Sequence, residues 1–142
     1  PVLLMKTWLS SSYSLNESTF YLLLFLNGAF VIIGHIFPIT MNFDGGKGTA
    51  SMIGVMFAID WKVGLISFVV LIIITLISDY LPFGVLIMYL TWGFLTYLFG
   101  YPLYAIWITF GLTLLCIYKH MENWKRIQNQ TETRVSSMLK KK

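Results

Sequence analysis

Long apolar segments without charged side chains constrain the fold of this chain more than any other feature. Residues 20–37 form a run of about 18 residues that lacks Asp, Glu, Lys and Arg, which is long enough for a helix to cross a bilayer of roughly 30 Å. Similar runs occupy residues 63–78, 83–99 and 103–118. A helix satisfies its backbone hydrogen-bonding groups within itself, as lipid requires. We therefore predict an all-α fold, a polytopic transmembrane helical bundle.

The composition supports a single membrane domain over residues 1–142. Only 11% of the residues are charged and 57% are hydrophobic, whereas about 25% of the residues in a soluble domain are charged. Residues 49–59 form a shorter apolar run, and at about 1.5 Å per residue its helix would need shelter from other helices. The chain begins with Pro1, and residues 1–9 resemble the end of a helix whose start is missing, so we expect a fragment of a larger domain.

The distribution of basic residues predicts the orientation in the membrane. The segment 119–142 is polar and carries most of the positive charge, at Lys119, Lys125, Arg126, Arg134 and residues 140–142. Because basic residues near membrane segments favour the cytoplasmic side, we predict a basic cytoplasmic tail. Alternation of the apolar segments then places residues 45–48 on the cytoplasmic side and residues 10–19 outside.

Residues 45–48, Gly-Gly-Lys-Gly, are predicted to bind a phosphate group. Gly45, Gly46 and Gly48 let backbone N–H groups converge on one oxyanion, and Lys47 adds a full positive charge. A helix starting near Thr49 adds the positive end of its dipole. The pattern lacks the early glycine and the final Ser or Thr of a nucleotide-binding P-loop. The alternative is a flexible cytoplasmic turn with a lysine that sets topology.

Two histidines accompany polar groups near the membrane edge. His35 lies three residues before Pro38, close to the glycine loop. If the last helix continues past the membrane, His120 and Asn123 are neighbours on one side, and Glu122 and Arg126 form an i,i+4 pair. The alternatives are an interfacial histidine and an ordinary basic juxtamembrane helix with a surface ion pair.

Other functional classes find little support in the sequence. The single cysteine, Cys116, lies within an apolar run, where it would serve packing. The net charge of +4 is small and concentrated near the C-terminal end, so we expect no nucleic-acid partner. No metal-ligand cluster is visible in the sequence, and we expect no metal and no cofactor.

Together the motifs resemble the bacterial acyl-phosphate:glycerol-3-phosphate acyltransferases. Gly-His-Ile-Phe-Pro at residues 34–38, followed by Phe-Asp-Gly-Gly-Lys-Gly-Thr-Ala at residues 43–50, resembles the second signature of that family. His-Met-Glu-Asn-Trp-Lys-Arg at residues 120–126, with Thr131 and Glu132, resembles the third. Met121 and Gln130 depart from the usual Arg and Gly. The resemblance extends over essentially the whole chain.

The resemblance implies an enzyme of phospholipid synthesis in the bacterial cell (inner) membrane. It would transfer a fatty acyl group from acyl-phosphate to the 1-hydroxyl of glycerol-3-phosphate, giving lysophosphatidic acid and phosphate. We assign phosphate binding to residues 45–48 and catalytic roles to His35, Lys47, His120 and Asn123. Glu122 and Arg126 would give structural support. His35 and His120 would hydrogen-bond phosphate or help to remove the hydroxyl proton, although a substrate phosphate could itself take that proton.

The first signature of the family, a Gly-Ser-Gly-Asn-Pro-Gly loop, has no counterpart in these residues. Because that loop helps to build the family's active site, we expect the 142 residues alone to be inactive. The alternative function is a non-enzymatic membrane scaffold or transport subunit that binds anionic lipid head groups. A binding protein would tolerate Arg at position 47, whereas a catalytic site built for a compact charge would not.

Overall fold

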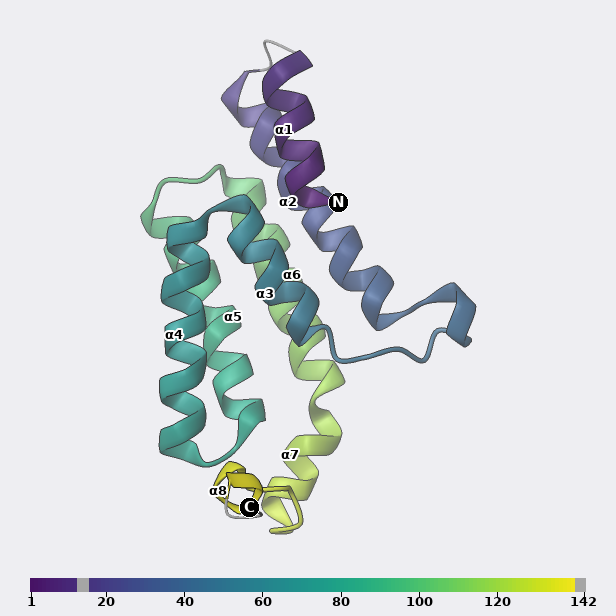
Figure 1. The fold of residues 1–142 in the computed structure, drawn as a ribbon, viewed down its shortest axis with the longest axis vertical. Helices are drawn as coiled ribbons and strands as arrows, with labels where there is room; N and C mark the ends of the chain where they lie inside the picture. Colours follow the sequence, from purple (N-terminus) through teal and green to yellow (C-terminus); the bar gives the residue numbers. More distant parts are fainter. Residues whose placement is uncertain (13–15, 140–142) are drawn as a thin grey trace.

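The computed structural model describes residues 1–12 and 16–139 of the chain, and it is helical as the sequence predicts (Figure 1). The elements in chain order are α1 (Val2–Ser12), α2 (Glu17–Ile36), the 3₁₀ turn η1 (Ile39–Met41), α3 (Thr49–Ile59), α4 (Trp61–Ser78), α5 (Leu81–Leu98), α6 (Leu103–Lys119), α7 (Met121–Gln128) and α8 (Val135–Leu139). The observed bounds differ from the predicted apolar runs by three residues or fewer at any end, because polar caps such as Asn16 and Asp60 start the helices slightly earlier.

Helices α3 to α6 pack as an up-and-down bundle, with α2 against α3 and α6 and α1 against α2 and α3 (Figure 1). Within the described residues, α2 with η1, α4 and α5 are long and apolar enough to cross a membrane. Helices α6 and α7 together form one further candidate span, bent by 49°. Large apolar side chains such as Ile77 and Trp107 remain exposed on the outer surface, as expected for helices that face lipid.

The bundle core is built from aromatic rings and from close helix contacts at glycine. The rings of Phe25 and Trp92 stack with centroids 5.8 Å apart, and both side chains are buried. A Cβ atom at Gly84 would lie 2.7 Å from the carbonyl oxygen of Leu71, so only glycine allows α4 and α5 to approach this closely.

Helix α3 is short, and other elements surround it as the sequence analysis required. Its residues Met52, Val55 and Met56 are almost completely buried. The Lys6 ammonium group donates hydrogen bonds to the carbonyl oxygens of Ala58 and Ile59, at 3.3 and 2.7 Å, which satisfies two backbone acceptors at its C-terminal end. The N-terminal end of α3 follows the glycine loop, and α7 lies at this same end of the bundle (Figure 1).

Candidate functional site

The loop between α2 and α3 folds back onto the end of α2. Pro38 follows the helix, η1 makes one turn, and Asn42 and Phe43 both adopt left-handed backbone conformations, with φ of 53° and 62°. The Gly45 N–H then donates a 3.2 Å hydrogen bond to the carbonyl oxygen of Ile36. The loop therefore closes on itself and presents residues 45–48 beside the helix that carries His35.

Glycine is required at two points of this loop for steric reasons. A Cβ atom at Gly45 would lie 2.3 Å from the carbonyl oxygen of His35, which a backbone atom cannot avoid by rotating. Gly48, which precedes α3, has φ of +82°, a conformation that glycine adopts without strain. The glycines thus permit a close return of the backbone immediately before a helix N-terminus.

Lys47 connects this loop to α7. Its ammonium group donates a hydrogen bond to the side-chain oxygen Oδ1 of Asn123, 76 residues further along the chain. The Nδ2 group of Asn123 donates a 2.7 Å hydrogen bond to Oε1 of Glu132, and Nε of Arg126 donates a 2.7 Å hydrogen bond to Oε2 of the same carboxylate. The four side chains form a continuous chain of charged and polar groups that ends at the glycine loop.

The chemistry of its partners fixes the orientation of the Asn123 amide. An ammonium group can only donate and an ionised carboxylate can only accept, so the amide oxygen must face Lys47 and the amide nitrogen must face Glu132. Asn123 is only 5% exposed. A buried amide with both ends paired is held in one position. Asn123 therefore determines where the Lys47 ammonium group lies.

The Glu132 carboxyl is held in its ionised form. Burial would raise its pKa, but hydrogen bonds from Arg126 and Asn123, together with the positive charges of Arg126 and Lys47, lower it below the usual value. Glu132 belongs to the residues that resemble the third signature, whereas the sequence predicts structural support from Glu122. Glu122 does lie 3.9 Å from Arg126, but its side chain is 83% exposed. The shorter contact of Arg126 is with Glu132, whose side chain is 12% exposed.

His120 occupies the bend between α6 and α7 and is 4% exposed. The helix does continue past residue 119 as α7, but the chain bends by 49° at His120 between α6 and α7. Nδ1 of His120 lies 2.9 Å from the carbonyl oxygen of Cys116, which can only accept, so Nδ1 donates and the neutral ring keeps Nε2 as its acceptor. The buried His120 ring also lies near the Lys47 charge.

His35 is exposed and lies against the loop instead of in the chain of side chains described above. Its Nε2 atom would be 2.5 Å from a Cβ atom at Gly46, so the ring covers that glycine. The structure thus brings Lys47 together with Asn123 directly, brings His35 to Gly46, and sets His120 near the Lys47 charge. The chemical roles of these groups stay predictions.

A cleft of about 360 Å³ opens at this site. It is lined by Asp44, Gly45, Lys47, Tyr118, Lys119, Met121 and Glu122. The cleft therefore joins the second-signature loop to the junction of α6 and α7, with two lysines and two carboxylates on its walls. Within the described ranges, no three His, Cys, Asp or Glu side chains gather in a way that could hold a metal ion.

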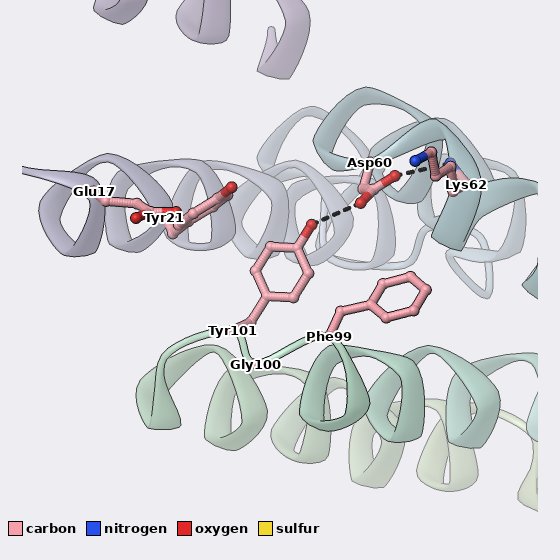
Figure 2. A pocket seen from close by; sticks show the side chains of 7 residues that line it. All are labelled: Glu17, Tyr21, Asp60, Lys62, Phe99, Gly100 and Tyr101. Atoms are coloured by element: carbon pink, nitrogen blue, oxygen red, sulfur yellow. Dashed lines mark hydrogen bonds between the residues drawn. The ribbon is translucent and has the colours of Figure 1, made fainter.

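A second pocket, of about 350 Å³, lies at the opposite end of the bundle (Figure 2). Figure 2 shows the Tyr101 hydroxyl directed at Asp60, to whose Oδ2 it donates a 2.8 Å hydrogen bond. Oδ1 of Asp60 accepts a 2.8 Å hydrogen bond from the backbone N–H of Lys62, which caps α4. Burial would raise the pKa of Asp60, but these hydrogen bonds outweigh it and lower the pKa.

Comparison with known proteins places the chain in a family. A family model described as glycerol-3-phosphate acyltransferase matches residues 1–130. Glycerol-3-phosphate acyltransferase 1 of Oceanobacillus iheyensis is 51% identical over 123 residues, which cover 86% of this chain and 58% of that protein. Glycerol-3-phosphate acyltransferase 2 of Thermotoga maritima is 35% identical over 106 residues, 74% of this chain and 53% of that protein. The chain thus spans little more than half the length of these relatives.

Two solved structures share the fold. One is PlsY (YgiH), an integral membrane glycerol 3-phosphate acyltransferase, in its glycerol 3-phosphate form, with a TM-score of 0.78 and 26% identity over 94% of this chain and 66% of that chain. The lysophosphatidic acid form matches with a TM-score of 0.69 and 28% identity, over 82% of this chain and 70% of that chain. From the family match over residues 1–130 and these likenesses, we conclude that the chain belongs to the glycerol-3-phosphate acyltransferase family.

Proposed function

We propose that this chain provides the phosphate-binding part of an acyltransferase that moves a fatty acyl group from acyl-phosphate to the 1-hydroxyl of glycerol-3-phosphate. The products would be lysophosphatidic acid and inorganic phosphate. The observation that carries the proposal is the hydrogen bond between Lys47 and Asn123, because it joins the glycine loop to the third signature at one cleft. The names of the relatives support the acceptor substrate, and the acyl-phosphate donor comes from the resemblance.

The glycine loop would hold a substrate phosphate. Lys47 supplies a positive charge, and the N-terminus of α3 supplies backbone N–H groups immediately after Gly48. Lys119 lines the same cleft and adds a second positive charge, while Asp44 and Glu122 limit how much anionic charge the cleft can accept. This balance favours a phosphate monoester held at one point over a polyphosphate.

The chemical step would be attack of the glycerol hydroxyl oxygen on the acyl carbonyl carbon. The new C–O ester bond forms as the C–O bond to phosphate breaks, and the phosphate leaves with the bonding electrons. Lys47 would stabilise the negative charge that develops on the substrate oxygens, and Asn123 would keep that ammonium group in place. The hydroxyl proton would pass to Nε2 of neutral His120 or to a substrate phosphate, and His35 would contact phosphate at Gly46.

The orientation in the membrane is also a proposal. The basic tail supports a cytoplasmic location for the end that carries Lys47 and α7. Cysteine introduced at the exposed Ser137 should react with a membrane-impermeant thiol reagent only after the cells are permeabilised. Cysteine introduced at the exposed Ser10 should react in intact cells. Labelling of Ser137→Cys from outside would reverse the assignment.

The function is tested by a pair of assays in one lipid environment. The chain alone, and the chain joined to a segment that carries the family's first signature, are each given acyl-phosphate and labelled glycerol-3-phosphate. We expect lysophosphatidic acid from the second preparation and none from the first. An acyl-thioester donor serves as the comparison, since a site that needs a leaving phosphate should not use it. Failure of the joined preparation to form product from acyl-phosphate would overturn the proposal.

A further inference from the structure

The turn between α4 and α5 contacts the C-terminal segment through a compact set of hydrogen bonds. Asp79 ends α4 with φ of 62°, and its two carboxylate oxygens accept hydrogen bonds from the backbone N–H and the hydroxyl of Ser136, each at 2.7 Å. The carbonyl oxygen of Asp79 also accepts a 3.0 Å hydrogen bond from the N–H of Val135. We call this set of contacts among Asp79, Val135 and Ser136 the clasp.

The clasp joins two parts of the chain that the family pattern does not link. Asp79 and Ser136 are 57 residues apart in sequence. Residues 134–137 lie beyond the residues 1–130 that the family model matches. The Arg134 guanidinium group also lies 5.9 Å from the centre of the Tyr80 ring. Three hydrogen bonds and a cation–π contact from consecutive residues indicate a specific docking of this segment below α4 and α5, where Figure 1 shows α8.

A short strap, residues 131–136, runs from α7 to the clasp. At its first end the N–H groups of Thr131 and Glu132 both donate to the carbonyl oxygen of Arg126, at 2.8 and 3.2 Å. At its other end the clasp holds it on the α4–α5 turn. The Glu132 side chain, at the α7 end of the strap, accepts a 2.7 Å hydrogen bond from Nδ2 of Asn123. Glu132 thus lies three residues before Val135, where the clasp holds the other end of the strap.

We propose that Asp79 is a positioning residue for the phosphate site. By fixing the strap, Asp79 keeps the Glu132 carboxylate against Asn123, and Asn123 in turn sets the position of the Lys47 ammonium group. The turn between α4 and α5 thereby influences the position of Lys47, in a loop on a different part of the bundle. This inference rests on the proposed function for its effect on substrate, while the clasp itself can be tested without any reaction.

The decisive comparison is between Asp79→Gly and Asp79→Asn. Both residues tolerate the left-handed backbone at position 79, so neither adds turn strain. Asparagine retains an acceptor for the Ser136 N–H and a donor for its hydroxyl, whereas glycine removes both of these contacts with Ser136. Ser136→Ala removes one contact and leaves the turn unchanged. Ser137→Ala is the matched control, because its hydroxyl donates to Arg134 within the same segment and does not reach Asp79.

Two measurements on the full chain in lipid separate the clasp from its consequence. The first is the rate of trypsin cleavage after Arg134, which reports whether the strap is held. The second is binding of glycerol-3-phosphate, with inorganic phosphate as a second probe, followed by ³¹P NMR. We expect Asp79→Gly to raise the cleavage rate about tenfold and to weaken anion binding by about threefold to tenfold. Ser136→Ala should change both quantities in the same direction, but less. Asp79→Asn and Ser137→Ala should resemble wild type.

Each outcome decides one part of the inference. Unchanged cleavage in Asp79→Gly would overturn the clasp. Faster cleavage with unchanged anion binding would overturn the positioning role and leave the clasp as a purely structural contact. If the wild-type chain binds neither probe, the proposed phosphate site fails, and the positioning role fails with it, while the cleavage rates still decide whether the strap is held.

Discussion

The two ends of the helix bundle offer cavities of similar volume, about 360 Å³ beside Lys47 and about 350 Å³ beside Asp60. Each is lined by lysine, by carboxylates and by at least one tyrosine. The difference lies in what these groups contact. At the Asp60 end, the carboxylate accepts from Tyr101 and from the Lys62 backbone, and the nearby Lys6 ammonium group binds the carbonyls that end α3.

At the Lys47 end, the polar groups form a chain that leads toward the cleft instead of closing on helix ends. Glu132 holds Asn123, Asn123 holds Lys47, and Lys47 lies between glycines that precede the N-terminus of α3. An incoming phosphate there would meet a charge and backbone donors already in position. Cavity size and charge content therefore do not distinguish a candidate binding site from a structural contact. The hydrogen-bond partners of the polar groups do distinguish them.

The largest expected effect comes from removing the Lys47 charge. In the chain joined to a segment that carries the family's first signature, Lys47→Ala should lower acyl transfer by about 10²-fold or more, as loss of a charge-stabilising donor does. Lys62→Ala, at the other end, is the matched control and should retain wild-type turnover. Lys47→Arg should remain impaired, because a planar guanidinium does not replace a compact ammonium group. Normal turnover in a folded Lys47→Ala protein would remove the distinction between the two ends.

The next effect concerns the backbone of the glycine loop. A methyl group at Gly45 would meet the His35 carbonyl oxygen at 2.3 Å, so Gly45→Ala must displace the loop. Overpacking of this kind costs about 1–3 kcal/mol, and we expect acyl transfer to fall by about tenfold or more. Gly54→Ala in α3 is the control, since a Cβ atom there has no atom within 4 Å. Equal activity of the two variants would show that the loop tolerates displacement.

A smaller effect should separate the two glutamates near Arg126. Glu132→Gln leaves one oxygen where Asn123 and Arg126 each need an acceptor, so one of them loses its partner. Hydrogen bonds to charged groups contribute about 1.5–3 kcal/mol, and we expect about a tenfold weaker binding of glycerol-3-phosphate. Glu122→Gln should change binding by less than about twofold, because exposed ion pairs contribute little. The reverse order would restore the supporting role that the sequence analysis gave to Glu122.

The helices and the meeting of Lys47 with Asn123 at one end could be anticipated, because apolar length and alternation of segments determine them. The break at His120 could not, since residues 103–128 contain no proline or glycine after Gly111 to indicate a bend. The role of Glu132 depends on a chain reversal after α7, where Gln130 has φ of 57°. Local spacing favours the i,i+4 partner Glu122 and contains no signal for a contact made through such a reversal. The Asp60–Tyr101 contact likewise joins residues 41 apart in sequence, so local spacing does not indicate it.

The smallest expected effect is on stability, at the Asp60 end. Tyr101→Phe removes the hydroxyl that donates to Asp60 and should lower the free energy of unfolding by about 1 kcal/mol, with acyl transfer unchanged. The hydrogen bonds to Asp60 lower its pKa in the folded protein. Ionised Asp60 therefore stabilises the fold at any pH above the ordinary Asp pKa of about 3.9, and this contribution is lost as the pH falls through the lowered pKa of the folded state. The variant has a smaller pKa depression. The stability difference between the two proteins should therefore be largest near neutral pH and should narrow in acid, as the pH falls through the lowered pKa of Asp60. Unfolding in detergent at both pH values measures this, and a parallel loss of acyl transfer would show that the two ends are coupled.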